Sequence, residues 1–509
     1  MANARLATNG YPVVLTADRT LMADYPVLFD GMMGTIQTTT VPEPIMRNII
    51  APPLRSDGLA ARKAPLGLRR IEAALLGDGF RREDVILCTP EDLEKCVGPR
   101  TRIVAVSSSD PLGRGMSNST MSDMAGGTLY THTWYKRLLL QLKEKKETCS
   151  FKIVAGGAGA WQLAQNEAAR RNLGIDTVVE GYAEAQIAPW FHELMDGRAL
   201  PPIVNSRSSH ENEIPAICGP TSMGVVEISR GCGKGCQFCT IATERMIHIP
   251  IDVVVSDVER NVERGVTSIC ALSEDFFRYG GSSRMPVNPP VLKELIRRLR
   301  EVKPLKLIQI DHANVISVAE YSDDDLREVH DLLVRGQRHR YLWVNLGVET
   351  ASGELLDMNQ KGGKIRPFKP AEWGELCDQQ IRRLIKAGYF PLVSLIMGLP
   401  GETPEDVAKT VRWIENLYHE RLVIFPIFYS PVIPGLGHHF KIEEMTPMHW
   451  RLFRLAYNLN FKWIPKMYWD NQTGAGASLF RRLFIQFTGQ FQILQWKMQF
   501  VRKSGRLFA

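Results

Sequence analysis

The chain lacks several features that would indicate a secreted or membrane-spanning protein. Its 509 residues contain no run of eighteen apolar residues, so we expect no transmembrane helix. The first eight residues lack the continuous apolar core of a secretory signal. The nine cysteines are an odd number and, apart from one group, are scattered, which argues against a disulfide framework. We therefore expect a cytoplasmic protein in a reducing compartment.

The one group of cysteines is the most informative feature of the sequence. Cys232, Cys236 and Cys239 lie in the segment Ser229-Arg-Gly-Cys-Gly-Lys-Gly-Cys-Gln-Phe-Cys-Thr240. Three thiolates are one short of the usual four for a 4Fe-4S cluster, which leaves one iron open for chemistry. The alternating glycines of this segment allow the positive φ angles that a tight wrap around a cluster needs.

The same cysteines are also compatible with a zinc site or with unligated thiols. A structural zinc site normally completes its tetrahedron with a fourth Cys or His at short spacing. The next histidine, His248, is nine residues beyond Cys239, which disfavours zinc. Three buried thiols without a metal are the remaining alternative.

Beyond residue 225, strand patterns alternate with helix patterns. The expected strands are residues 225–229, 268–273, 306–311, 342–348, 392–397 and 422–428. The expected helices are residues 290–302, 323–335, 371–388 and 404–420. This alternation predicts an α/β fold, a six-stranded βα partial TIM barrel, whose active site lies at the carboxyl ends of the strands. The cysteine segment follows the first strand, where that rule places chemistry.

Polar segments follow other predicted strands as well. They are Ser273-Glu-Asp275, Asp311-His-Ala-Asn314, Gly347-Val-Glu-Thr350 and Met397-Gly-Leu-Pro-Gly-Glu402. Each of them is also compatible with a simple turn or helix cap. Their shared position at strand ends favours a site.

The cysteine segment resembles the signature of the radical S-adenosylmethionine (SAM) superfamily. The resemblance covers roughly residues 220–435 and implies that Cys232, Cys236 and Cys239 hold a 4Fe-4S cluster whose open iron chelates SAM. It further implies that the reduced cluster cleaves SAM to a 5'-deoxyadenosyl radical, with an electron donor such as flavodoxin or ferredoxin.

The same resemblance implies further cofactor contacts. Phe238 matches the aromatic residue that packs near the adenine, Glu349 lies in the segment that approaches the ribose, and Gly398 lies in the segment against the adenine. Ser273 and Glu274 stand where the family normally has Gly-Gly-Glu, whose backbone receives the methionine amino group. The chain departs from the family at this motif.

Residues 101–197 have the pattern of a small α/β domain. A strand at 153–156 runs into a glycine-rich turn, with further strands at 103–106 and 176–181. Gly156 and Gly157 could open a cofactor site or could make a plain strand-to-helix turn.

This segment resembles the Rossmann-like cobalamin-binding domain of one radical SAM subgroup. The resemblance rests on Gly156-Gly157 and on Gly181-Tyr-Ala-Glu184, and it implies a bound cobalamin. The subgroup's Asp-x-His-x-x-Gly is absent, because Asp110-Pro-Leu-Gly-Arg-Gly115 has no histidine. Either cobalamin binds without a protein ligand from this loop, or the domain has kept the fold and lost the cofactor.

Three further cysteines, Cys88, Cys96 and Cys149, raise the alternative of a second iron-sulfur cluster, as in methylthiotransferases. Their wide, irregular spacing favours buried, unligated thiols instead.

The end of the chain is basic and aromatic. Residues 451–509 contain ten Lys or Arg and one acid, Asp470. Residues 479–502 can form a helix with an apolar face, which either packs over the open side of the barrel or lies in a membrane interface. Nucleic acid is the least favoured partner, because the basic residues form no dense run.

These observations predict an N-terminal extension (1–100), a cobalamin-binding-like domain (101–200), a linker (201–222), a radical SAM partial barrel (223–440) and a helical C-terminal region (441–509). The expected function is that of a radical SAM enzyme that methylates, cyclises or remodels an unactivated carbon, with cobalamin, on a small hydrophobic substrate of the lipid or tetrapyrrole kind. The alternatives are a methylthiotransferase and a non-catalytic metal-binding protein that docks peripherally on membranes.

Overall fold

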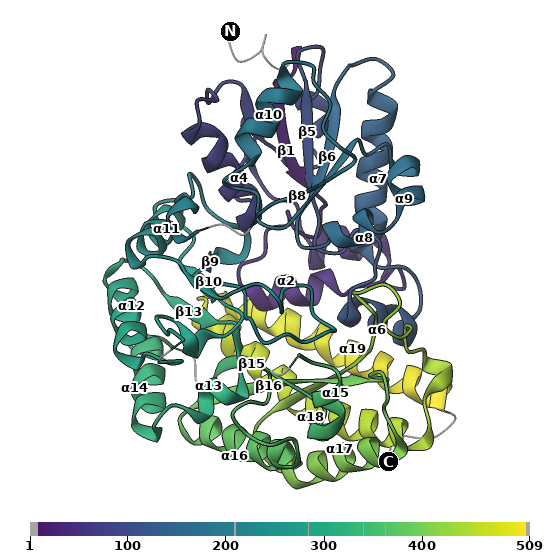
Figure 1. The fold of residues 1–509 in the computed structure, drawn as a ribbon, viewed down its shortest axis with the longest axis vertical. Coiled ribbons are helices and arrows are strands. Elements are labelled where there is room, and N and C mark those ends of the chain that lie inside the picture. The colour runs from purple at the N-terminus through teal and green to yellow at the C-terminus, as the bar shows by residue number, and fades with distance from the viewer. Residues whose placement is uncertain (1–8, 208–209, 284, 339–340, 362, 505–509) are drawn as a thin grey trace. The chain divides into compact units, whose positions relative to one another are not determined.

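The computed structural model describes residues 9–207, 210–283, 285–338, 341–361 and 363–504, which form two compact units (Figure 1). Unit 1 consists of the chain up to Ser122, Gly126–Val226 and Asp252–Val266. Unit 2 consists of Asp123–Ala125, Glu227–Ile251 and the chain from Thr267 onward.

Unit 1 is built on a six-stranded parallel sheet of order β4-β1-β5-β6-β7-β8. In sheet order the strands are Val85–Leu87 (β4), Val13–Ala17 (β1), Ile103–Ser107 (β5), Lys152–Gly156 (β6), Thr177–Glu180 (β7) and Ile203–Asn205 (β8). The three strands expected between residues 101 and 197 are confirmed. The sheet also takes β1 and β4 from the first 100 residues and β8 from residues 201–222, where the sequence pattern indicates an extension and a linker.

Strand β1, which lies between β4 and β5, is buried on both faces, as a parallel sheet with helices on either side requires. Val13 and Leu15 pack with the helices Leu66–Gly77 (α4) and Ile187–Met195 (α10). Val14 points the opposite way and packs with Tyr130–Lys145 (α7) and Ala160–Ala164 (α8). Figure 1 shows α4 and α10 on one side of this sheet and α7 on the other. The two-residue period of the strand therefore supplies both halves of the core.

Residues up to 263 contain further short elements. They are the helices Leu28–Thr35 (α2), Glu43–Ile45 (α3), Met46–Ile50 (a π-helix), Leu93–Cys96 (α5), Met116–Ala125 (α6), Glu167–Leu173 (α9) and Ile251–Glu263 (α11), the hairpin Ser56–Asp57 (β2) with Ala60–Ala61 (β3), and 3₁₀ turns at Glu211–Glu213 and Ser222–Gly224.

Unit 2 holds the partial barrel, whose neighbouring strands pair in parallel. Its strands are Val225–Glu227 (β9, at the boundary of the units), Ser268–Leu272 (β12), Leu307–Ile310 (β13), His312–Ala313 (β14), Leu342–Glu349 (β15), Tyr389–Met397 (β16) and Val423–Phe428 (β17). They form sheets of order β13-β12-β9 and β14-β15-β16-β17. Only Asp311 separates β13 from β14, so these two strands continue one another and all six predicted strands are present.

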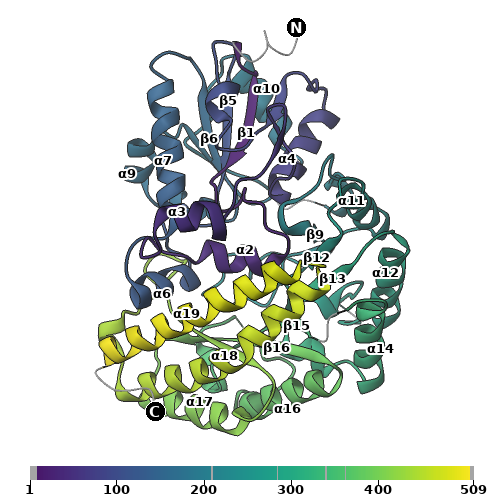
Figure 2. The same ribbon diagram turned by 180° about the vertical axis from the view of Figure 1, so that it is seen from behind.

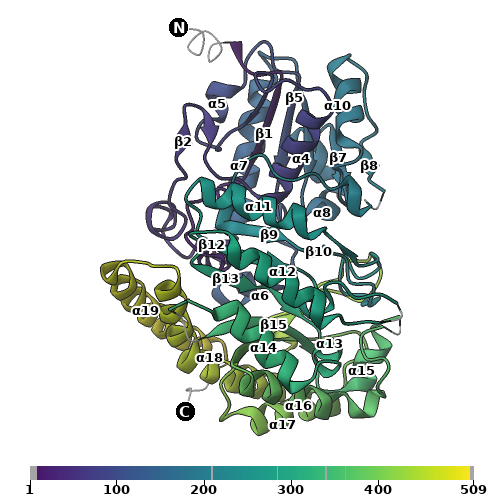
Figure 3. The same ribbon diagram turned by 90° about the vertical axis from the view of Figure 1, so that its left-hand side faces the viewer.

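Helices follow the strands and cover the outside of the barrel (Figure 3). They are Pro289–Glu301 (α12), Val315–Ala319 (α13), Asp323–Val334 (α14), Gly353–Met358 (α15), Trp373–Lys386 (α16) and Pro404–Leu417 (α17), with 3₁₀ turns at Phe276–Arg278, Pro370–Glu372 and Ile442–Glu444. The start of α17 follows the sequence signal, because Thr403 accepts a hydrogen bond from the Asp406 N–H and Pro404 occupies the first turn. The fold class expected from the sequence is confirmed.

The open edge of the barrel at β17 is covered by the helix Pro447–Gly474 (α18). The buried Asn460 accepts a hydrogen bond from the Ile424 N–H (2.9 Å) and donates one to the Ile424 carbonyl (2.7 Å). Its amide thus takes the place of a neighbouring strand at an edge that would otherwise expose unpaired backbone groups. The last helix, Leu479–Ser504 (α19), packs against α18 (Figure 2).

A buried ion pair links distant segments within unit 1 and gives a stability test. Arg70 of α4 and Asp257 of α11 meet at 2.5 Å with side chains at most 1% exposed, and Asp257 also accepts the Ile217 N–H at 2.9 Å. We predict that Asp257→Ala lowers the free energy of unfolding by about 3–5 kcal/mol, because it leaves the buried Arg70 guanidinium without its carboxylate partner. The matched control, Glu263→Ala, breaks the exposed pair Arg260–Glu263 on the same helix and should cost under about 1 kcal/mol. Denaturant unfolding of the full chain measures both, and equal losses would contradict the prediction.

Candidate active site

The cysteine segment forms a tight loop at the carboxyl end of the first barrel strand. The short strands Ser229–Arg230 (β10) and Ile247–His248 (β11) pair antiparallel at its base. Gly231, Gly233 and Gly235 all have positive φ angles, of 71°, 68° and 72°. A Cβ on Gly231 would lie 2.5 Å from the Arg245 carbonyl oxygen, so this turn can be made only by glycine. The wrap predicted from the glycines is confirmed.

The three cysteine side chains of this loop are shielded from solvent. Cys236 is buried, and Cys232 and Cys239 are partly buried. Burial raises the pKa of the Cys232 thiol, that of Cys236 to about 11 and that of Cys239 to about 12. Uncharged thiols of this kind become ligands when a metal stabilises the thiolates.

The donor set suits a 4Fe-4S cluster. Among the described residues, no three His, Cys, Asp or Glu side chains are close enough together to hold one metal ion. In a 4Fe-4S cluster each thiolate binds a different iron, so the sulfurs stand farther apart than around zinc. Three thiols in one shielded loop are the donor set that such a cluster takes.

Cationic side chains surround the cysteine loop. Arg278 donates a hydrogen bond to the Cys232 carbonyl at 2.9 Å. Lys234 lies within the loop, and burial lowers its pKa. Lys364 is buried, which lowers its pKa, but the charges of Glu349, Cys236 and Cys232 act more strongly together and leave the pKa raised. These cations offset the negative charge that three thiolates bring into a site of low polarity.

Glu349, at the end of β15, is held in place by Lys364. Lys364 Nζ lies 3.0 Å from Glu349 Oε1, and Ser394 Oγ lies 3.3 Å from Oε2. Glu349 has a φ of 68°, which is rare for a residue other than glycine and occurs often at functional sites. A Cβ on Gly347 would meet Glu349 Oε1 at 2.3 Å and Lys364 Nζ at 2.8 Å, so this glycine makes room for the ion pair.

In the segment after β12, two side chains make hydrogen bonds within the protein and a third is partly exposed. Ser273 is buried and its hydroxyl lies 2.6 Å from that of Ser229, which ties the segment to the base of the cysteine loop. Asp275 is buried and accepts the Asn314 N–H at 3.1 Å. Glu274 is partly buried, and burial raises the pKa of its carboxyl group. Its carboxylate is the group of this segment that remains for a ligand.

Gly398 and Phe238 lie in packed surroundings. The Gly398 N–H donates to Glu402 at 2.9 Å, and the Phe440 ring lies where a Cβ of Gly398 would be, 2.3 Å away. Packing alone therefore explains this glycine. Phe238 is buried. Contact of either residue with an adenine stays a prediction.

Sequence reasoning named no role for two residues near these strand ends. His312, in the polar segment after the third predicted strand, is half-exposed, and its Nδ1 lies 3.0 Å from Asp311 Oδ2. Burial lowers the pKa of His312, but the carboxylates of Asp311, Glu274 and Glu349 together outweigh that effect and raise it to about 9. Lys364 lies in a loop without strand, helix or motif, so nothing in its sequence context could have indicated it.

The carboxyl edge of the sheet in unit 1 is the place where such sheets bind ligands. From β1 the chain passes to β4 on one side of it, and then to β5 on its other side. The direction of winding therefore reverses between β1 and β5, and such a point is where these sheets bind ligands. Gly156 ends β6 at this edge, and Gly157 follows it. A Cβ on Gly157 would lie 2.5 Å from Ser107 Oγ, whereas a Cβ on Gly156 would meet only the Val179 carbonyl oxygen, at 3.9 Å.

The loop after β5 has no histidine, and the carboxylate of its Asp110 is fully hydrogen-bonded within the protein. Asp110 is buried and accepts hydrogen bonds from the Arg114 N–H (2.8 Å), Asn118 (2.6 Å) and Gln162 (2.5 Å). His132 approaches this loop, but its Nδ1 lies 2.7 Å from the Pro111 carbonyl. The topology fits a cobalamin, and the loop supplies no free ligand for its metal.

Cys88, Cys96 and Cys149 lie in the hydrophobic core of unit 1. Cys88 and Cys96 are fully buried, Cys149 nearly so, and all three pack among apolar side chains on the α7 face of the sheet. A hydrogen bond with Cys96, together with burial, raises the pKa of the Cys88 thiol. The prediction of buried thiols at these three positions is confirmed.

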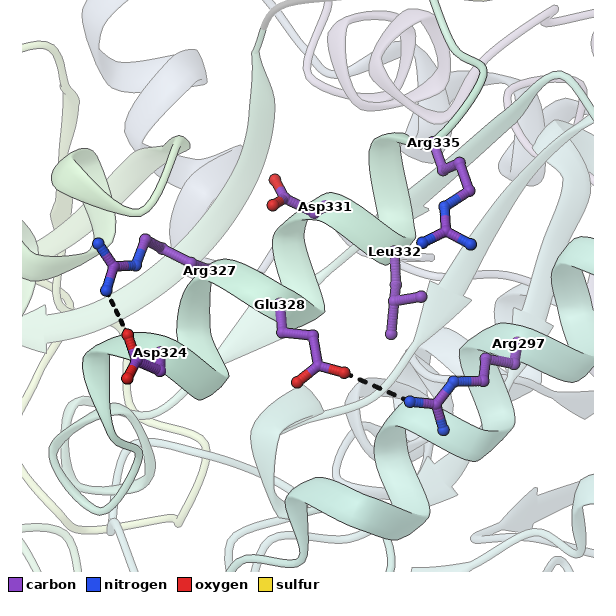
Figure 4. Close-up of a pocket in the computed structure, with 7 residues that line it drawn as sticks. All are labelled: Arg297, Asp324, Arg327, Glu328, Asp331, Leu332 and Arg335. Atoms are coloured by element: carbon purple, nitrogen blue, oxygen red, sulfur yellow. Dashed lines mark hydrogen bonds and ion pairs between the residues drawn. The ribbon is translucent and has the colours of Figure 1, made fainter.

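A surface hollow of about 470 Å³ lies apart from these strand ends, on α12 and α14 (Figure 4). It is lined by Arg297, Asp324, Arg327, Glu328, Asp331, Leu332 and Arg335. Arg297 pairs with Glu328 and Arg327 with Asp324, so its charges largely satisfy one another. It is a solvated helix surface.

Comparison with known proteins decides the family. Residues 226–414, from the first to the fifth barrel strand, match the radical SAM superfamily. This part of the chain is a radical SAM domain. The chain therefore contains a radical SAM domain, which implies a 4Fe-4S cluster and SAM and supports an enzyme over the non-catalytic alternative.

The similar proteins differ in reaction. Ribosomal protein uS12 methylthiotransferase RimO of Trichlorobacter lovleyi is 24% identical over 64% of this chain and 70% of its own length. RimO of Pelobacter propionicus is 24% identical over 48% of this chain and 51% of its own length. The chain thus spans about half the length of several of the relatives it matches.

A solved structure shares more of the fold. The radical SAM methyltransferase TsrM of Kitasatospora setae, with a tryptophan substrate and a SAM analogue bound, aligns with a TM-score of 0.53 at 16% identity. The alignment covers 82% of this chain and 73% of TsrM. This likeness supports the fold of unit 1 together with the radical SAM domain.

Asp18, which follows β1 at the carboxyl edge of unit 1, gives a test by pH. Burial raises its pKa to about 6, although Thr20 and Ser108 donate hydrogen bonds to it. The folded state therefore holds this proton at pH values where the unfolded state has lost it, so stability falls as pH rises from about 4 to about 6 and stays lower above.

We predict that Asp18→Asn removes this fall. A rise of about two pKa units corresponds to about 3 kcal/mol. Between pH 4 and pH 7 the parent chain should therefore lose about that much free energy of unfolding relative to Asp18→Asn. Denaturant unfolding at several pH values measures it, with Asp196→Asn on an exposed position as control. Parallel pH profiles for Asp18→Asn and the parent chain would contradict the burial of a titrating carboxyl group.

Proposed function

We propose that the chain is a radical SAM methyltransferase that acts with cobalamin on a small hydrophobic substrate. Cys232, Cys236 and Cys239 would hold the 4Fe-4S cluster. When bound, the cluster supplies the electron that splits SAM, and cobalamin carries a methyl group. The observation that carries the proposal is the pairing of a three-cysteine loop with a doubly wound sheet in unit 1 whose own cysteines are buried in its core.

The side chains at the barrel mouth would position SAM. Glu349, fixed by Lys364 and Ser394, presents a carboxylate at a strand end, which suits the hydroxyl groups of a ribose. Phe238 offers a buried aromatic face of the kind that packs on adenine. Because these groups are held by neighbours before a ligand arrives, the radical carbon would form at a fixed place, which is what selective hydrogen abstraction needs.

The chain's own residues would also manage charge and water. Lys234, Arg278 and Lys364 lie around the cysteines and favour the thiolate form that ligates iron. His312, paired with Asp311, would hold a proton at the third strand end. Gly156, where a Cβ would meet no atom closer than 3.9 Å, and Gly157 would lie against the cobalamin.

Methylthiolation is the second candidate, because the relatives named above are methylthiotransferases. It requires another cluster in addition to the one at the barrel. Cys88, Cys96 and Cys149 are poor ligands for it, since they are enclosed by apolar side chains. This packing is the reason for preferring methylation.

One anaerobic experiment separates the two candidates. The full chain is purified or reconstituted with iron, sulfide and hydroxocobalamin, then reduced with SAM present, and iron, corrinoid, 5'-deoxyadenosine and S-adenosylhomocysteine are measured. We expect one cluster and one corrinoid per chain and release of S-adenosylhomocysteine. Twice that iron content without corrinoid would favour methylthiolation and contradict the proposal.

Cysteine variants assign the ligands in the same assay. Cys232→Ala, Cys236→Ala and Cys239→Ala should each abolish the visible absorbance of the cluster and all cleavage of SAM. The control Cys218→Ala removes an exposed cysteine and should keep both. A full cluster in any of the first three variants would overturn this assignment.

A further inference from the structure

Helix α19 has one face that packs within unit 2. Its buried Phe500 contacts Phe453 and Tyr457 of α18 with ring centroids 5.8 and 4.7 Å apart. Trp496 lies 5.6 Å from Tyr457, and Gln486 donates a hydrogen bond to the Pro465 carbonyl at 2.6 Å. The position of α19 is therefore fixed by one side of the helix (Figure 2).

The opposite face of α19 exposes large apolar side chains. Eight of them are between 39% and 80% exposed: Leu479, Phe480, Leu483, Phe484, Phe487, Phe491, Leu494 and Met498. Their spacings of three, four and seven residues place them on one side of the helix. A continuous apolar stripe of this kind on a water-facing surface marks a contact site.

The charge on this helix indicates what covers the stripe. Residues 479–504 contain Arg481, Arg482, Lys497, Arg502 and Lys503 and no Asp or Glu. Lys497 and Arg502 are exposed and, by helical spacing, lie at the two borders of the stripe. A second copy of the helix would bring five cations against five, so the charge opposes pairing of two copies. An anionic lipid surface satisfies both the apolar stripe and the cations.

The helix cannot cross a bilayer. Within the described part of the chain, no helix is long and apolar enough to do so. A helix with one apolar face and cationic borders lies instead in the plane of the interface.

We propose that α19 docks the protein on an anionic lipid surface. Phe480, Phe487 and Phe491 enter the region between headgroups and acyl chains, and Lys497 and Arg502 meet the lipid phosphates. This inference is independent of the reaction proposed above, since it rests on the exposed face of α19 alone.

Vesicle co-sedimentation of the full chain tests the proposal. Phosphatidylglycerol-containing vesicles are compared with phosphatidylcholine vesicles, at low and high salt. We expect roughly tenfold stronger binding to the anionic vesicles and a loss of that preference at high salt. The triple variant Phe480→Ser, Phe487→Ser, Phe491→Ser should lose binding to both, because the stripe is removed.

A matched control removes three exposed apolar side chains elsewhere. Ile45→Ser, Ile49→Ser, Leu140→Ser should bind like the parent chain, and circular dichroism verifies that both triple variants are folded. Lys497→Gln with Arg502→Gln should weaken anionic binding alone.

Three outcomes would overturn the proposal. They are absence of binding to anionic vesicles, equal binding to both lipids at low salt, and a dimer seen by light scattering that the Phe variant abolishes while vesicle binding is absent. The last result would assign the stripe to a second copy of the chain.

Discussion

The candidate active site depends on a backbone constraint, the left-handed turns that Gly231, Gly233 and Gly235 make in a single loop. These turns put three buried thiols at the end of the first barrel strand, where they are uncharged unless a metal or nearby cations stabilise the thiolates. Lys364 and Arg278 are positioned to do so, and Lys364 in turn fixes Glu349. The cluster loop and the fourth strand end are therefore coupled by charge as well as by the fold.

Glycines at the other strand ends have different causes. Gly398 and Gly157 are required by neighbouring protein atoms, the Phe440 ring and Ser107, and so need no ligand to explain them. A Cβ on Gly156 would make only an ordinary contact, at 3.9 Å, and Gly347 leaves space that the Glu349–Lys364 pair fills. The same residue type thus serves a turn, a close packing contact or a site, and only the surrounding atoms distinguish these uses.

The sequence predicted the barrel well because its strands are apolar runs that end in polar segments, as with Ser268–Leu272 before Ser273-Glu-Asp275. It did not reveal that Val13–Ala17 is an interior strand of the sheet in unit 1, since a short strand buried on both faces shows no alternation. Lys364 could not be predicted, because its pairing with Glu349 is set by a loop without local pattern. Of the two interpretations of the last helix, packing within the domain is partly right, since one face of α19 packs on α18. The opposite face is exposed, and its contact with a membrane interface stays a prediction.

The central claim is that the three-cysteine loop holds a 4Fe-4S cluster with one iron open to SAM. Electron paramagnetic resonance of the anaerobically reduced full chain, recorded with and without SAM, tests it most directly. The account predicts the signal of a reduced 4Fe-4S cluster whose g values change when SAM is added, because the open iron gains new ligands. A spectrum that SAM leaves unchanged, or a loop that holds zinc and no iron, would contradict it.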